Sequence, residues 1–521
     1  MLRRGEQFSA PGAAGVPATA PNARRARLLD HEPASLPILR IERPTVDAGM
    51  RQRSDERRQK IAVASVFVAA MFINIIDATV VNVALPTIAL QFGVPVDRTA
   101  SINIGFLVAV AVAIPVAGWL GDRFGPRGVF VGALAAFTAA SAACGLAGTV
   151  DQLVVFRVLQ GLGGGLMTPV GLAMLFRTFP ARERVRLSRI TTVPIAFAPA
   201  LGPVLGGFLV EHVNWRWIFG INIPVGVLAI VFTLIWVRPL DRAPRTSLDV
   251  AGFLLAGIGF AALMFAVSEG ASRGWGSSLI VSTGLIGIAL LALLVPVELR
   301  RAAPMLQLQL YRQRLFRSAN LITMASAAGF IGALFAYPLM LQTSFGYGAL
   351  EAGLLTFPEA IGIMVGTQIV GRFYPQVGPR RLIATGQSVV CAILLTMAAL
   401  SGGRVPPLLL VLLMAVLGLG QSNTFVPTQA AAFDTVPPTQ IGAGTSLYNA
   451  TRQVGSAIGV ALAATVIATI GVGTAPHADP TPFRWALVAC AACNVLGVLL
   501  AFTVHDDDAA PSRGRQRERP A

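Results

Sequence analysis

Charged residues are scarce in this sequence. Only 13% of its 521 residues are Asp, Glu, Lys or Arg, whereas 54% are hydrophobic; soluble proteins carry roughly 25% charged residues. So apolar a composition excludes an intrinsically disordered chain and argues against a soluble enzyme. Because a helix that crosses a bilayer needs about 20 mainly apolar residues, the composition predicts a protein with many membrane-spanning helices.

Lysine, histidine and cysteine are also rare. Lys60 is the single lysine, and no GxxxxGK[ST] phosphate-binding loop surrounds it, which excludes a nucleotide-driven pump within this chain. The four histidines lie outside the apolar segments and no HExxH motif occurs, so we expect neither a metal site nor an enzyme. The four cysteines lie in apolar stretches and are interpreted as small buried hydrophobes.

The apolar residues are arranged in fourteen segments, each long enough for a transmembrane helix. The more polar residues 1–60 and 505–521 are interpreted as cytosolic tails, the first of them basic and disordered. Helix is the expected structure, because backbone groups in lipid must be paired within their own segment. The expected spans are 61–85, 101–120, 128–149, 152–175, 188–210, 217–237, 249–268, 278–298, 319–341, 350–373, 382–400, 407–428, 441–470 and 483–504.

The net charge of +16 suggests at first a partner such as nucleic acid, but the positions of the arginines exclude one. The arginines of the loops gather in alternate loops, such as residues 177–189 and 300–317, and the opposite loops hold few. This is the positive-inside pattern of membrane proteins. It predicts that both termini are cytosolic.

Four charged residues remain well inside the apolar segments: Asp77, Arg157, Glu359 and Arg452. A charge near the middle of a bilayer costs roughly 2.5–3.5 kcal/mol on insertion scales, so each is a candidate functional residue. Counted along their helices at 1.5 Å per residue, Asp77 and Arg157 lie at similar depths. Whether they touch depends on helix rotation, which the sequence does not give.

Glu359 and Arg452 both lie near mid-membrane by the same count. We expect them to face a central cavity and to interact in at least one conformation, because intramembrane charges usually find partners. The alternative is a protonated Glu359 that is hydrogen-bonded to the backbone.

An internal repeat divides the chain. The stretch from Gly118 to Arg127 follows the second segment, and a related stretch from Gly371 to Arg380 follows the tenth. Eight segments separate the copies, so the sequence predicts two six-helix bundles, 61–237 and 319–504, with two helices at 249–298 inserted between them. The second copy has Pro375 and Gln376 where the first has Asp122 and Arg123.

Several sequence motifs together resemble those of a known protein family. They are DATVVNVALP from Asp77, GWLGDRFGPRG from Gly118, RVLQGLGGG from Arg157, GPVLGG from Gly202, NWRWIFGINIPVG from Asn214 and NATRQVGSAIG from Asn449. In this order and spacing they resemble the major facilitator superfamily, and within it the fourteen-helix drug:proton antiporter family of the EmrB/QacA type. The resemblance implies an all-α integral membrane fold around a central cavity. It also implies a proton-coupled antiporter that exports hydrophobic small molecules or drugs, cationic ones included, by alternating access.

The resemblance also implies roles for residues. Asp77 and Arg157 would couple protons to transport; the alternative is a static structural ion pair. A cytosolic latch would join the two bundles, although the same loop has a simpler reading as an ordinary positive-inside loop. An antiporter motif would allow a kink and close packing in the fifth helix. The latch residues are Gly118, Asp122, Arg123, Gly125 and Arg127, and the antiporter motif comprises Gly202, Pro203, Gly206 and Gly207.

The expected partners follow from this reading. They are a small-molecule substrate, protons and membrane lipids, with a periplasmic adaptor protein as a further candidate. No cofactor is expected, because the proton gradient would supply the energy. The expected location is the bacterial cytoplasmic membrane. The alternative function is a dedicated exporter of one metabolite, lipid or self-made antibiotic.

Overall fold

The computed structural model describes residues 46–94, 96–239, 249–301, 304–403, 405–471 and 479–504. The described residues are almost entirely helical and contain no β-strand. The tail at 505–521 and the tail residues before Val46 lie outside this description. The helices are α1 (Val46–Phe92), α2 (Val96–Phe124), α3 (Pro126–Leu146), α4 (Val150–Thr178), α5 (Ala181–His212), α6 (Trp217–Gly220), α7 (Asn222–Trp236), α8 (Val250–Arg273), α9 (Ser278–Arg300), η1 (Leu308–Arg312), α10 (Arg314–Thr343), α11 (Ala349–Thr356), α12 (Pro358–Val377), α13 (Pro379–Leu400), α14 (Pro407–Ala432), η2 (Pro438–Gln440), α15 (Ile441–Ile470) and α16 (Thr481–Ala501).

The expected all-α membrane architecture is confirmed. Among the described residues, 13 helical stretches are long and apolar enough to cross a membrane. The remaining expected span is α5, whose first half is rich in arginine but whose 32 residues exceed the length that a bilayer requires. The chain is therefore an integral, multi-pass membrane protein.

Two expected boundaries differ in the structure. Residues 46–60, expected to be disordered, form the first part of α1. The tenth segment is divided at Phe357 into α11 and α12. Pro358 begins α12 there, because proline lacks an amide hydrogen and fits the first turn of a helix, where that hydrogen would have no partner.

The helices of the expected halves pack mainly among themselves. In the first half α4 packs against α2 and α3, and in the second half α10 packs against α15 and α16 while α12 packs against α14. Helices from the two halves meet where α2 and α4 contact α15 and where α5 contacts α12 and α14. The limits of the halves themselves stay a prediction.

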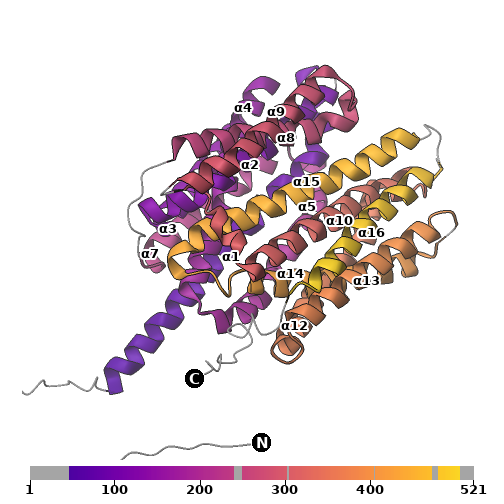
Figure 1. The fold of residues 1–521 in the computed structure, drawn as a ribbon. Helices are drawn as coiled ribbons and strands as arrows, with labels where there is room; N and C mark the ends of the chain where they lie inside the picture. Colours follow the sequence, from indigo (N-terminus) through magenta and orange to yellow (C-terminus); the bar gives the residue numbers. More distant parts are fainter. Residues whose placement is uncertain are drawn as a thin grey trace, which may run out of the picture. The chain divides into compact units, whose positions relative to one another are not determined.

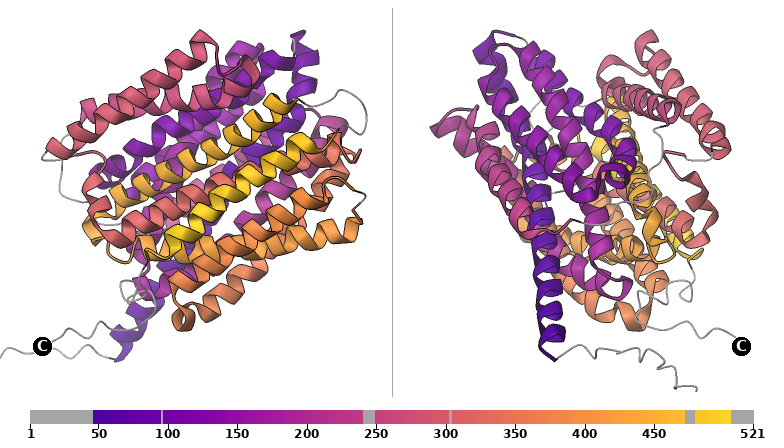
Figure 2. Two further views of the ribbon diagram at one scale, coloured as in Figure 1. Left: turned by 45° about the vertical axis from the view of Figure 1, so that its right-hand side comes forward. Right: turned by 90° about the vertical axis from the view of Figure 1, so that its left-hand side faces the viewer.

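The helices α8 and α9, which are expected to be an inserted pair, lie against each other at the margin of this packing. The rose-coloured pair runs beside α2 and α15 in Figure 1 and lies far from α12 and α13 in both views of Figure 2. Only α8 makes extensive contact with the rest, through α2 and α15, and α9 leaves most of its apolar side chains exposed. We therefore place the candidate site in the other helices.

Candidate functional site

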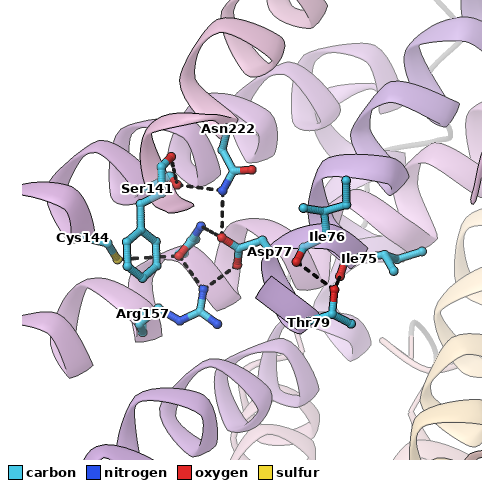
Figure 3. Close-up of polar contacts among 10 residues, drawn as sticks. Ile75, Ile76, Asp77, Thr79, Ser141, Cys144, Arg157 and Asn222 are labelled. Atoms are coloured by element: carbon cyan, nitrogen blue, oxygen red, sulfur yellow. Dashed lines mark hydrogen bonds and ion pairs between the residues drawn. The ribbon is translucent and has the colours of Figure 1, made fainter. Parts of the chain in front are cut away.

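Asp77 and Arg157, which the sequence could place only at similar depth, form an ion pair in the first half. Arg157 Nη1 donates to Asp77 Oδ2 at 2.5 Å, from α4 to α1, and both side chains are fully buried. Figure 3 shows the guanidinium directed at the carboxylate. The two side chains are thus joined by a buried, charge-assisted hydrogen bond.

Two amide side chains complete the shell around Asp77. Gln160 donates to Asp77 Oδ1 at 2.9 Å, and Asn222 of α7 donates to the same oxygen at 2.8 Å. Gln160 also accepts from Arg157 at 2.8 Å, and Asn222 also donates to Ser141 at 3.0 Å. Figure 3 shows Arg157 of α4 and Asn222 of α7 directed at the carboxylate of α1, with Ser141 of α3 beside Asn222. The carboxylate accepts three hydrogen bonds in all. We call these five residues the Asp77 cluster.

Gln160, Asn222 and Ser141 are uncharged and are not among the site residues expected from the sequence. A signal was present for two of them, since Gln160 lies one helical turn after Arg157 and Asn222 lies inside the NWRWIFGINIPVG motif. The contact itself needed the tertiary structure, because it joins α1, α4 and α7.

Aromatic rings close the cluster on the side of Arg157. Its guanidinium carbon lies 4.2 Å from the ring centre of Phe106 in α2 and 5.7 Å from that of Phe219. Cation–π contact stabilises the guanidinium where water is excluded. Among the described residues, Arg157 Nε and Nη2 have no hydrogen-bond partner, so Asp77 and Gln160 carry its polar contacts.

The glycines after Arg157 explain how α4 packs so closely against α2 and α3. A Cβ atom added at Gly161 would lie 2.4 Å from the backbone oxygen of Phe106, and one at Gly163 would lie 2.7 Å from the backbone nitrogen of Phe137 in α3. Both distances are below what real Cβ contacts allow, so α2 and α3 can pack on α4 only because these positions carry no side chain.

The expected latch lies at the contact of α2 with α15. The amide of Gly118 donates to Ser446 Oγ at 2.8 Å, so the first copy of the repeat contacts the second half directly. Asp122 forms an ion pair with Arg177 at the end of α4. A Cβ atom added at Gly442, in the first turn of α15, would lie 2.6 Å from Asp122 Oδ1. The carboxylate therefore lies at the positive end of the α15 dipole.

Two further latch residues, Gly125 and Arg127, make their described contacts within the first half. Gly125 has a φ of 89°, a conformation that favours glycine, and it caps the start of α3. Arg127 donates to the backbone oxygen of Leu234 in α7 at 2.7 Å. The structure thus brings Gly118 and Asp122 to the junction, and it does not bring Arg127 there.

The antiporter motif lies in α5, opposite α1. A Cβ atom added at Gly202 would lie 2.1 Å from Thr79 Oγ1, so the absence of a side chain at Gly202 permits this close approach. The helix continues through Pro203 to His212 without a break. Gly206 is buried, and a Cβ atom at Gly207 would meet nothing within 4 Å.

A cavity of about 270 Å³ lies mainly in the second half and contains both Glu359 and Arg452 in its wall. We call it the Glu359 cavity. Its wall comes from α10, α12, α14 and α15, with Ile75 of α1 and Ile195 of α5 on the side of the first half. Glu359 and Arg452, which were expected to face one cavity, both line this one.

The expected interaction between these two residues is not formed in this conformation. The structure describes both side chains and records no ion pair between them within 4.0 Å. Their pairing stays a prediction for another conformation. Glu359 is brought into the cavity wall by Gly418 of α14, where an added Cβ atom would lie 2.0 Å from the backbone oxygen of Glu359.

A second cavity of about 210 Å³ adjoins the first on the side of α4. It is lined by Asn74, Thr168, Gln429 and Asn449 among others, and we call it the Asn74 cavity. Arg452 lines both cavities, as do Ile75, Ile195, Phe425 and Tyr448. Arg452 therefore lies at their junction. Asp77 lines neither of the two, because its cluster is closed by the first-half helices.

Comparison with known proteins identifies the family of the chain. The family description "Major Facilitator Superfamily" matches residues 67–250 and 319–521. A protein of Mycobacterium tuberculosis (strain ATCC 25618 / H37Rv), named "Multidrug resistance protein B homolog", is 34% identical over 436 residues, which cover 82% of this chain and 80% of that protein. MdtD of Escherichia coli O157:H7, also named as a multidrug resistance protein, is 34% identical over 408 residues, covering 77% and 84%.

A solved structure supports the fold alone. The crystal structure of the human organic anion transporter MFSD10 superimposes with a TM-score of 0.62 at 15% identity and covers 85% of this chain and 99% of that chain. The matched stretches of the family leave out α9 and nearly all of α8. From the sequence matches, the helices and the buried site together, the chain belongs to the major facilitator superfamily and is a membrane transporter rather than an enzyme.

Proposed function

We propose that the protein is a proton-coupled antiporter that exports hydrophobic small molecules or drugs by alternating access. The observation that carries this proposal is the separation of two carboxylates. Asp77 is fully buried against Arg157, whereas Glu359 lies in the wall of a cavity. This separation supports a role for Asp77 in holding a coupling proton and a role for Glu359 in contacting substrate.

The Asp77 cluster would act as the coupling element. Protonation of Asp77 removes the negative charge that compensates Arg157, and a buried unpaired guanidinium is strongly unfavourable. To give the unpaired Arg157 a new environment, α1 and α4 would have to move relative to each other. This movement would change the packing of the first half, whose residue Ile75 lines the Glu359 cavity. Release of the proton restores the pair and the starting conformation.

The Glu359 cavity would bind the substrate. Side chains such as Phe330, Leu334, Ile363 and Phe425 make most of its wall apolar, which suits hydrophobic molecules. The relatives named for multidrug resistance support drugs as the substrate class.

The location and the partners are proposed on the same basis. We place the protein in the bacterial cytoplasmic membrane with both termini in the cytosol, driven by the proton gradient without a cofactor. Lipids surround it, and a periplasmic adaptor protein is a candidate partner if the substrate must cross a second membrane.

Proton release in proteoliposomes tests the coupling. The purified protein is reconstituted with a pH-sensitive dye inside, and ethidium is added as a hydrophobic cation under an imposed pH gradient. We expect substrate to cause proton movement in the wild type and none with Asp77→Asn. Asp151→Asn is the matched control, since Asp151 is an exposed acid at the start of the same α4 that carries Arg157.

Undiminished substrate-driven proton movement with Asp77→Asn would contradict the coupling role. Loss of proton movement in the Asp151→Asn control as well would show that the assay reports surface charge and would refute the assignment to Asp77.

A further inference from the structure

The Glu359 cavity contains an acid and a base that do not neutralise each other. Glu359 and Arg452 are both partly exposed to it, and neither is described with a side-chain partner among the residues that the structure covers. Unpaired ionisable groups in a mostly apolar wall are unfavourable, because each has lost hydration without gaining a counter-charge. A ligand with one positive and one negative group would give each residue a counter-charge and so remove both costs.

The two groups enter the cavity from different sides. Glu359 is on α12, which packs against α14 and α5, whereas Arg452 is on α15, which packs against α10, α2 and α4. The apolar side chains of Phe330 and Phe425 line the same cavity. A molecule lying in it can therefore present one end to α12 and the other to α15, with its apolar body against these rings.

Hydroxyl groups in the same wall also lack partners. Thr424 Oγ1 and Thr428 Oγ1 of α14 are buried and form no hydrogen bond among the described residues, and both threonines line the cavity. Buried polar groups are normally hydrogen-bonded. This second observation independently indicates a ligand with polar atoms rather than a purely hydrocarbon one.

We propose that the cavity selects dipolar substrates, which are hydrophobic molecules that carry a basic group for Glu359 and an acidic group for Arg452. This inference rests on the proposed export function and adds the substrate class. It places Arg452, at the junction of the two cavities, in contact with the acidic group. The guanidinium suits a carboxylate because it can donate two parallel hydrogen bonds.

Four compounds with one apolar core test the proposal. They are 4-biphenylalanine, its methyl ester, its N-acetyl derivative and the N-acetyl methyl ester, which are respectively dipolar, cationic, anionic and neutral. Equilibrium binding to the purified protein is measured with radiolabelled 4-biphenylalanine, and the other three serve as competitors. We expect the dipolar compound to bind about tenfold or more tightly than either singly charged compound, as loss of one charge-assisted contact would predict.

Two variants test which residue binds which charged group of the ligand. With Glu359→Gln we expect the dipolar compound to bind no better than the N-acetyl derivative, and with Arg452→Gln no better than the methyl ester. Arg484→Gln is the matched control, because it removes an exposed positive charge in the first turn of α16 and Arg484 lines neither cavity. It should change the affinities less than about twofold.

Equal binding of the dipolar compound and its methyl ester, or no measurable binding of the dipolar compound, would overturn the proposal. So would an Arg452→Gln variant that keeps the preference for the free carboxylate. These results are independent of the export function. That function fails if a bound compound drives no proton movement in proteoliposomes, whichever compound binds best.

Discussion

The two halves of the molecule use an acid and a base in opposite ways. In the first half Asp77 and Arg157 are fully buried, in contact, and surrounded by amide donors. In the second half Glu359 and Arg452 share a cavity without forming a pair. A closed pair keeps its charge balance within the protein, whereas an open pair leaves its charges available to a ligand. In our proposal, the acid and base of the first half therefore serve coupling and those of the second half serve binding.

The repeat shows where this difference arises. Glu359 precedes Gly371 by the same interval as Phe106 precedes Gly118, and Met414 precedes Gly418 as Arg157 precedes Gly161. Gly161 packs on the backbone of Phe106, and Gly418 packs on the backbone of Glu359. Where α2 crosses α4, Arg157 thus lies over Phe106. Where α12 crosses α14, the buried Met414 occupies the position of the arginine and Glu359 that of the phenylalanine. Different side chains at these two pairs of equivalent positions therefore give the first half a buried arginine and the second half a glutamate in a cavity wall.

The largest expected effect is on stability, and it is measured by substituting each of the two carboxylates in turn. Asp77→Asn leaves Arg157 buried without a counter-charge, which we expect to lower the free energy of unfolding by about 3–5 kcal/mol. Glu359→Gln should cost less than about 1 kcal/mol, because no ion pair is lost in this conformation. Thermal unfolding in detergent measures both.

A double variant separates folding from coupling in the first half. Asp77→Asn with Arg157→Gln removes both buried charges and should recover most of the lost stability without restoring proton-coupled export. Equal destabilisation by Asp77→Asn and Glu359→Gln would abolish the distinction between a closed and an open pair.

An intermediate effect should follow from building the first-half pair into the second half. Met414→Arg places a guanidinium one turn before Gly418, at the crossing that carries Glu359. We expect the new arginine to pair with Glu359, stop transport and leave a folded protein. Double-mutant cycles with Glu359→Gln should give a coupling energy of about 0.5–3 kcal/mol. Additive effects of the two substitutions would show that position 414 does not reach Glu359.

The smallest expected effect concerns the junction between the halves. Asp122→Ala removes the carboxylate from the start of α15, an interaction worth about 0.3–1 kcal/mol, so turnover should fall about two- to fivefold. Substrate affinity should stay unchanged, because Asp122 does not line either cavity. Turnover of ethidium in proteoliposomes and its equilibrium binding are compared for the same preparation. A matching loss of affinity would identify Asp122 as a folding determinant.

Much of the fold follows from hydropathy. The segments expected at 441–470 and 483–504 correspond closely to α15 and α16. The break between α11 and α12 was missed, although Pro358 marks it, because proline is tolerated within membrane helices. The helical residues 46–60 were missed because their charges resemble those of a disordered tail.

The sequence by itself determined the number and type of the spans, the four intramembrane charges and their depths, because a bilayer requires long apolar helices and allows few charges within them. Only the tertiary structure decided that Asp77 meets Arg157, Gln160 and Asn222, while Glu359 and Arg452 share a cavity without pairing. Depth is fixed by position along a helix. Contact depends on how each helix is rotated and on which neighbour its glycines allow to approach, and these follow from packing between segments far apart in the chain.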